Sequence, residues 1–148
     1  MGHDTISVLL PAAPPAATST PSTRTGWCPA TRAMTNLDGL RDSLRAFAAA
    51  RDWGQFHSPK NLATALSVEA AELLEIFQWM TEADSRDLGA AAKAAASEEI
   101  ADVLLYLILL ADGLGIDPVA AAERKMAANA QKYPVDKARG NSKKYTEL

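Results

Sequence analysis

The sequence predicts an all-α domain built as a four-helix bundle, and three observations support this fold class. Apolar residues recur at three- and four-residue steps in separate segments, which is the period of an amphipathic helix. A Ser-Pro and an Asp-Pro pair, at 58–59 and 117–118, are typical helix starts. No segment shows the alternation expected of a strand. The 148 residues suffice for one domain with its own core.

The first two predicted helices span residues 37–51 and 59–80, with residues 53–57 as a loop between them. In the first, Leu37, Leu40, Leu44 and Phe47 form one apolar stripe. The second begins with Ser58 as N-cap and Pro59 at the first helical position. Its expected core side consists of Leu62, Leu66, Leu73, Ile76 and Phe77, and an acidic stripe runs beside it: Glu69, Glu72 and Glu75.

The remaining two predicted helices span residues 90–112 and 118–133. A polar connection at 81–90, with a short turn at Asp84-Ser85, precedes the third helix, and Gly113 and Gly115 end it. Asp117-Pro118 starts the fourth helix, which Pro134 stops. The stretch from 135 to 148 is polar and basic.

The N-terminal stretch, residues 1–35, differs from the rest in composition. It is rich in Pro, Ala, Thr and Ser and has no helical period, so we expect a disordered tail ahead of a domain at 36–148. Residues 6–17 resemble a signal-peptide core only faintly, since they lack a basic leader and contain prolines. With Cys28 as the only cysteine, these features predict a cytoplasmic protein.

Charge and hydropathy argue against nucleic acid and membrane as partners. The net charge of −3 gives no general attraction for nucleic acid. The longest apolar run, 100–111, is too short to span a bilayer and contains Asp102, so it predicts a buried helix. Its segment 104–110 is apolar in every direction around the helix. One small bundle cannot cover that much surface, so we expect a partner helix from another subunit.

Two acidic pairs with equal spacing, Glu69-x-x-Glu72 and Glu99-x-x-Asp102, are the main functional signal. Residues three apart share a helix face, so each pair offers two carboxylates to one point. Asp102 interrupts an apolar run, and its helical neighbours 98, 99, 105 and 106 include no basic residue, which excludes a local salt bridge. Such an oxygen-only set predicts Mg²⁺, with Mn²⁺ as a possible substitute, and phosphate chemistry.

Two other interpretations compete with this one. A di-iron site uses Glu-x-x-His pairs, whereas the domain has one histidine, His57, in a loop. Acidic residues on a helix also often lie on a solvated face, which would leave a non-catalytic helical interaction module.

The chain resembles the all-α nucleoside triphosphate pyrophosphatase superfamily, the MazG-like group. The family pattern is E-x-x-E, a spacer and E-x-x-D, followed by a Lys and an Asn four apart, here Lys125 and Asn129. Within the group, the dCTP pyrophosphatase branch is the most similar. That resemblance involves the loop 51–57, the segment Phe77-Gln78-Trp79 and the closing segment 144–148.

The resemblance implies a four-helix domain that pairs and then forms a homotetramer. It also implies hydrolysis of a nucleoside triphosphate, dCTP or a modified dCTP, to the monophosphate and pyrophosphate. A broader pyrophosphatase acting on dUTP or damaged nucleotides is the alternative. The expected metal ligands are Glu69, Glu72, Glu99 and Asp102, with Glu72 or Glu75 as the general base.

Aromatic and basic residues supply the expected substrate contacts. Aromatic faces stack on nucleobases, His57 offers a donor or acceptor, and Tyr106, one turn after Asp102, packs against the sugar and disfavours a 2′-hydroxyl. Trp79 has a second interpretation as a core or interface residue, Lys125 as a solvated helix residue, and the basic C-terminal segment as a flexible tail rather than a lid. The candidate substrate-binding residues are Trp53, His57, Trp79, Tyr106, Lys125, Asn129, Lys143 and Lys144.

Overall fold

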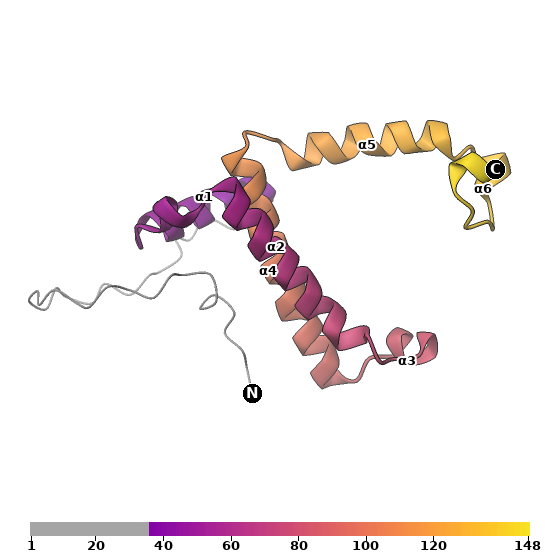
Figure 1. Cartoon of the computed structure of the whole chain (residues 1–148), viewed down its shortest axis with the longest axis horizontal. Coiled ribbons are helices and arrows are strands. Elements are labelled where there is room, and N and C mark those ends of the chain that lie inside the picture. Colours follow the sequence, from indigo (N-terminus) through magenta and orange to yellow (C-terminus); the bar gives the residue numbers. More distant parts are fainter. Residues whose placement is uncertain (1–35) are drawn as a thin grey trace, which may run out of the picture.

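A computed structural model describes residues 36–148, and the predicted tail at 1–35 lies outside the described residues. Between residues 36 and 148 the chain is helical and has no strand. Two long helices, α2 (Pro59–Phe77) and α4 (Ala90–Gly113), run antiparallel side by side as a hairpin (Figure 1). Helix α1 (Leu37–Ala49) packs on α4 near the end of the hairpin where α4 stops. The all-α class is confirmed.

Side-chain caps begin the helices where the sequence predicts. The Ser58 side chain accepts a hydrogen bond from the Asn61 amide at 3.2 Å, with Pro59 following as the first helical residue. The Asp117 carboxylate accepts from the amides of Val119 and Ala120, at 2.9 and 3.0 Å. Each cap satisfies amides that have no partner within their own helix, which is why these positions fix the helix starts.

The helix ends and the connections differ in detail from the prediction. Helix α1 stops at Ala49 and α2 at Phe77, short of the predicted ends at 51 and 80. In place of a simple turn at Asp84-Ser85 there is a short helix, α3 (Glu82–Arg86), because Thr81 and Asp84 cap each other reciprocally. Three further short helices form where irregular backbone is expected: η2 (Trp53–Phe56), α6 (Val135–Ala138) and η3 (Tyr145–Glu147).

The core lies between α2 and α4, and α1 adds to it at one end of the hairpin. Its buried apolar residues are mostly small, which lets the helices approach closely: Ala48, Leu62, Ala65, Ala96, Ile108 and Ala111. Of the predicted core side of α2, Leu62 is buried, and the other four residues are half-buried. The core is therefore thin, as expected of two helices covered by a third at one end only.

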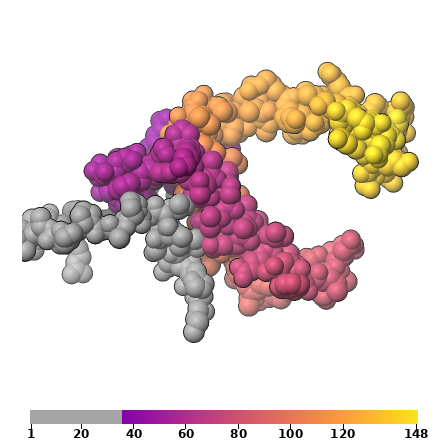
Figure 2. All heavy atoms as spheres, viewed as in Figure 1, coloured from indigo at the N-terminus to yellow at the C-terminus, as the bar shows by residue number. Residues whose placement is uncertain are grey.

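Helix α5 (Pro118–Lys132) leaves the hairpin as an arm, bent by 97° from α4. Gly115, at φ +65°, permits this sharp bend, and the Ile116 amide donates to the Ala111 carbonyl at 2.8 Å. No residue of α5 is buried, and Figures 1 and 2 show the arm standing clear of the hairpin. The four predicted helices are present, but within one chain α5 does not close the bundle.

Large apolar side chains remain exposed along the hairpin and the arm. On the hairpin these are Leu74, Ile100, Leu104 and Leu107, and on the arm Val119, Met126 and Tyr133. Exposed apolar side chains of this kind favour packing against a further helix, and a partner subunit stays a prediction. Within residues 36–148, no single helix meets the length and apolarity needed to cross a bilayer. The bent pair α4 and α5 meets them jointly, by length and composition only.

Candidate metal centre and adjoining pocket

Three carboxylates meet between the two hairpin helices. Glu69 projects from α2, and Glu99 and Asp102 project from α4; one oxygen of each lies within 4.8 Å of the others. The antiparallel pairing of α2 and α4 places the two acidic pairs at the same level. Glu69 is only 1% exposed, so its carboxylate has lost nearly all its hydration.

Two oxygens of this cluster are buried and lack a hydrogen-bond partner. They are Oε2 of Glu69 and Oε2 of Glu99. Buried polar atoms are nearly always paired in folded proteins, and an unpaired carboxylate oxygen is especially unfavourable. The cluster thus offers acceptors that nothing within residues 36–148 satisfies.

The pKa values of the three carboxylates show that their negative charges are not compensated. Loss of hydration, followed by repulsion from Asp102, Glu72 and Glu99, raises the pKa of Glu69 from 4.5 to about 7. Burial, and then the charge of Glu72, raises the pKa of Glu99 and that of Asp102. Near neutral pH, several negative charges therefore compete in one small volume.

Glu72 and Glu75 lie at the margin of the cluster. Glu72 is half-buried and acts on all three carboxylates electrostatically, but it is not part of the set within 4.8 Å. Glu75 is exposed, one position further along the acidic stripe of α2. Glu98 is exposed as well, on the solvent side of Glu99.

This arrangement fits a hard divalent cation. Carboxylate oxygens from two helices converge, two of them have open acceptor positions, and no histidine or cysteine belongs to the cluster. Mg²⁺ and Mn²⁺ take such oxygen ligands, whereas iron and zinc sites commonly include nitrogen or sulfur. A bound cation would also remove the repulsion that raises the carboxylate pKa values.

A mainly apolar cavity of about 100 Å³ adjoins the cluster, and Asp102 belongs to both. Its walls come from α1, the 53–57 loop, α2 and α4. Of the predicted substrate contacts, Trp53, His57 and Tyr106 line it. The other lining residues are Leu44, Phe47, Ala48, Phe56, Asn61, Leu62, Ala65, Leu105 and Leu109.

One wall of the cavity is an aromatic row. The Trp53 ring lies edge-on between Phe47, at a centroid distance of 5.7 Å, and His57, at 6.4 Å. Burial lowers the pKa of His57, so its ring is neutral at pH 7 and offers one donor and one acceptor. Tyr106 lines the cavity from α4, and burial and the charges of Glu69 and Asp102 raise its pKa, which keeps its hydroxyl protonated.

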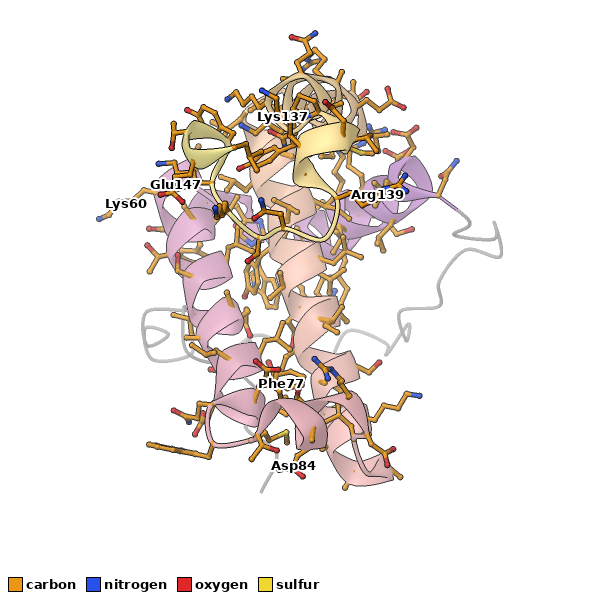
Figure 3. All side chains as sticks on the ribbon, turned by 90° about the vertical axis from the view of Figure 1, so that its right-hand side faces the viewer. Lys60, Phe77, Asp84, Lys137, Arg139 and Glu147 are labelled. Carbon is orange, nitrogen blue, oxygen red and sulfur yellow. The ribbon has the colours of Figure 1, made fainter. Side chains whose placement is uncertain are left out.

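The other predicted substrate-binding residues lie away from this cavity. Trp79 follows the end of α2 and is 89% exposed. Lys125 and Asn129 are on the arm, and Lys143 and Lys144 come after it. Figure 3, seen from the side toward which the arm points, shows Lys137 and Arg139 in front of the upper part of the hairpin and Phe77 toward its lower end, and Figure 1 shows that the segment after the arm stands clear of the hairpin. One chain therefore does not bring its basic segment to its own acidic cluster.

Nine of the thirteen residues that line the cavity are not predicted site residues, and three of these nine are aromatic or polar. Phe47 was assigned to the apolar stripe of the first helix, and Phe56 was part of the loop motif without a role. Asn61 lies in the first turn of α2, where its side-chain amide donates to the Phe56 carbonyl at 2.9 Å. The available signal was its place directly after the loop, beside the core residue Leu62.

Comparison with known proteins connects this geometry to one family. The MazG-like family matches residues 64–148. The chain belongs to the MazG-like family. That match begins inside α2 and includes the whole acidic cluster and the arm, while the aromatic loop at 53–57 precedes it. The MazG-like region thus carries the acidic cluster, and the preceding residues add most of the cavity wall.

Individual relatives extend the similarity to the N-terminal side. The chain is 45% identical over 114 residues to dCTP pyrophosphatase 1 of Homo sapiens, covering 76% of this chain and 67% of that protein. It is 41% identical over 114 residues to dCTP pyrophosphatase 1 of Bos taurus, covering 76% and 68%. The structure is similar to that of a pyrophosphatase from Archaeoglobus fulgidus, with a TM-score of 0.63 and 46% identity over 66% of this chain and 92% of that one.

Proposed function

We propose that this protein is a Mg²⁺-dependent pyrophosphohydrolase that converts dCTP, or a modified dCTP, to dCMP and pyrophosphate. The observation that carries the proposal is the three-carboxylate cluster with unpaired buried oxygens, opening through Asp102 into a cavity with an aromatic wall. A cation site beside a base-sized cavity matches the two ends of a nucleotide. The relatives named dCTP pyrophosphatase 1 support cytosine deoxynucleotides as the substrate class.

In this proposal Glu69, Glu72, Glu99 and Asp102 hold the cation. When bound, the cation neutralises charge on the phosphoryl oxygens and lowers the pKa of water. The protein's own part is to position water in line with the α-phosphorus and to accept its proton through Glu72 or Glu75. A bond forms from the water oxygen to the α-phosphorus, the bond to the bridging oxygen breaks, and pyrophosphate leaves.

The cavity would receive the nucleoside. The Trp53 ring provides a stacking face, and neutral His57 provides a donor or an acceptor for a base edge. Tyr106 lies one turn beyond Asp102 on the same helix face, between the phosphate site and the base site. Its ring would therefore pack against the sugar and disfavour a 2′-hydroxyl.

A second copy of the chain would complete the site. Lys125, Asn129, Lys143 and Lys144 suit the triphosphate by charge and hydrogen bonding, yet they lie on the arm or beyond it. The arm has no buried residue and carries exposed apolar side chains, as does the outer face of the hairpin. We therefore propose a homo-oligomer, a tetramer by the family resemblance, in which the arm and Trp79 of one subunit reach the cluster of another. We also propose a cytoplasmic location and no nucleic-acid or membrane partner.

Incubation with single nucleotides and Mg²⁺ in ¹⁸O-labelled water tests the activity. The expected result is dCMP carrying the label and unlabelled pyrophosphate, with dCTP preferred over dUTP, dTTP and CTP. Asp102→Asn is the matched inactive control. Equal rates for dUTP and damaged nucleotides would instead favour a broader pyrophosphatase, and absence of turnover of every nucleotide would contradict the proposal.

Mixing two inactive variants tests the shared site. Glu69→Gln and Lys125→Ala subunits are unfolded together and refolded, so that they assemble randomly. If Lys125 acts on the cluster of a neighbouring subunit, each mixed pair has one intact site, and the mixture regains about a quarter of wild-type activity. No recovery in a mixture shown to contain mixed oligomers would place Lys125 and Glu69 of one chain in the same site.

A further inference from the structure

The loop between α1 and α2 divides its residues between the cavity and the solvent. Trp53, Phe56 and His57 line the cavity. Asp52 and Gln55 are exposed and do not line it. The two residues are nevertheless hydrogen-bonded to each other.

Asp52 has a left-handed backbone, with φ 53° and ψ 35°, and is the only non-glycine residue between 36 and 148 with positive φ. It lies three residues after the end of α1, where the amides of Arg51 and Asp52 donate to the carbonyls of Ala48 and Ala49, at 3.1 and 3.2 Å. Most side chains resist this conformation, and only Asn, Asp and Gly adopt it readily. The residue therefore reverses the chain at a point where few alternatives fit.

The Gln55 side chain holds the turn at Asp52 through two hydrogen bonds. Its side-chain Nε2 donates to the Asp52 backbone carbonyl and to Oδ2 of the Asp52 carboxylate, both at 3.0 Å. These two bonds join Gln55, inside η2, to the residue that precedes η2. At the other end of the loop the Asn61 amide holds the Phe56 carbonyl. The loop is thus fixed at both ends, and only the second anchor belongs to the cavity wall.

The aromatic row depends on this turn. Phe47 belongs to α1, whereas Trp53 and His57 come after the reversal, and the three rings are stacked edge to face in sequence. The Arg51 guanidinium lies 3.5 Å from the Phe47 ring centroid and 5.7 Å from that of Trp53, on the row. A different backbone at Asp52 would turn Trp53 away from Phe47.

We propose that Asp52 and Gln55 are positioning residues, which fix the orientation of Trp53 and His57 for a ligand in the cavity without touching it. The left-handed turn aims the aromatic row, and the Gln55 bonds keep it in one arrangement. With respect to substrate this rests on the proposed function. The orientation of Trp53 itself does not, so the two are tested separately.

Enzyme kinetics on four variants test the effect on substrate. Asp52→Ala removes both the side-chain acceptor and the tolerance for positive φ, and Gln55→Ala removes both hydrogen bonds. Each is expected to raise KM for dCTP about 5- to 50-fold, since misplaced binding groups act mainly on substrate affinity, with kcat changed less than about threefold. Asp52→Asn keeps the tolerance for positive φ and a side-chain acceptor, so its KM should equal that of the wild type. Asp52→Gly keeps the tolerance for positive φ but no side-chain acceptor, so its KM should be restored only in part.

Asp87→Ala is the matched control, because Asp87 is an exposed loop aspartate with negative φ, and it should leave KM unchanged. A merely structural role would lower the active fraction, and so kcat, at constant KM. That result, or an equal loss in Asp52→Asn and Asp52→Ala, would overturn the proposal.

Fluorescence tests the orientation of Trp53 without any substrate. In a background carrying Trp27→Phe and Trp79→Phe, Trp53 is the only tryptophan. Asp52→Ala should increase quenching by iodide at least about twofold, because a ring released from the row becomes more exposed, while Asp52→Asn should not change it. Unchanged quenching in Asp52→Ala would overturn the proposal even if dCTP is hydrolysed, and the expected change would support it even if dCTP is not.

Discussion

Replacement of Glu69 by glutamine should stabilise the metal-free protein at neutral and alkaline pH. The structure holds Glu69 almost fully buried and raises its pKa from 4.5 to about 7. At 1.36 kcal/mol per pKa unit, ionising it in the folded state has a penalty of about 3 kcal/mol in the free energy of unfolding. Glutamine has the same shape without the charge, so it removes this penalty.

The sign of the pH dependence follows from proton binding. Between about pH 4.5 and 7 the folded protein holds a proton on Glu69 that the unfolded chain has released. Stability of the metal-free wild type should therefore fall as pH rises through this range and level off above it. The difference between Glu69→Gln and wild type should be small near pH 4.5 and approach about 3 kcal/mol in favour of the variant at pH 8.

Urea unfolding in the presence of a chelator, at pH 4.5 to 8, measures this difference. Glu75→Gln is the control, because Glu75 lies on the same helix and is exposed. The free energy of unfolding of this variant should equal that of the wild type at each pH. Saturating Mg²⁺ should reverse the order, stabilising the wild type more than Glu69→Gln. A Glu69→Gln protein less stable than wild type at pH 8 without metal would mean that the Glu69 carboxylate is satisfied in the metal-free protein, which would contradict this prediction.

Three further predictions concern the substrate. Trp53→Ala should raise KM for dCTP by about 5- to 150-fold, the equivalent of one lost base–aromatic stacking contact of about 1–3 kcal/mol; a KM within twofold of wild type would remove Trp53 from the base site. Tyr106→Ala should narrow the preference for dCTP over CTP, measured as the ratio of kcat/KM values, and an unchanged ratio would show that Tyr106 does not contact the sugar. Truncation after Tyr133 should raise KM for dCTP. Far-UV circular dichroism of the truncated protein should still show a folded hairpin, because the removed segment packs on Tyr133 at the arm's end. An unchanged KM would favour a solvated tail.

Local sequence signals were sufficient to place the helices and the acidic cluster. Ser58-Pro59 and Asp117-Pro118 are complete start signals, because cap and first residue are adjacent, and both helices begin there. The two acidic pairs lie at one level since their helices pair antiparallel. Asp102 stood out because it has no cation within one turn and interrupts an apolar run.

What the sequence did not show depends on contacts between segments. The direction of the arm follows from the bend at Gly115, and the periodicity of a helix contains no information on its angle to the next helix. The left-handed Asp52 looks like any polar residue in a loop. Asn61 looks like a surface residue of the first turn, and its role appears only once the Phe56 carbonyl lies beside it.

Calorimetric titration with Mg²⁺ and with Mn²⁺ is the most direct test that the paired carboxylates form a metal centre. We expect saturable binding by the wild-type protein and a dissociation constant at least about tenfold larger for Asp102→Asn, a loss of about 1.4 kcal/mol or more in binding free energy. Equal affinities in the two proteins, or no binding to the wild type at millimolar concentrations, would contradict it.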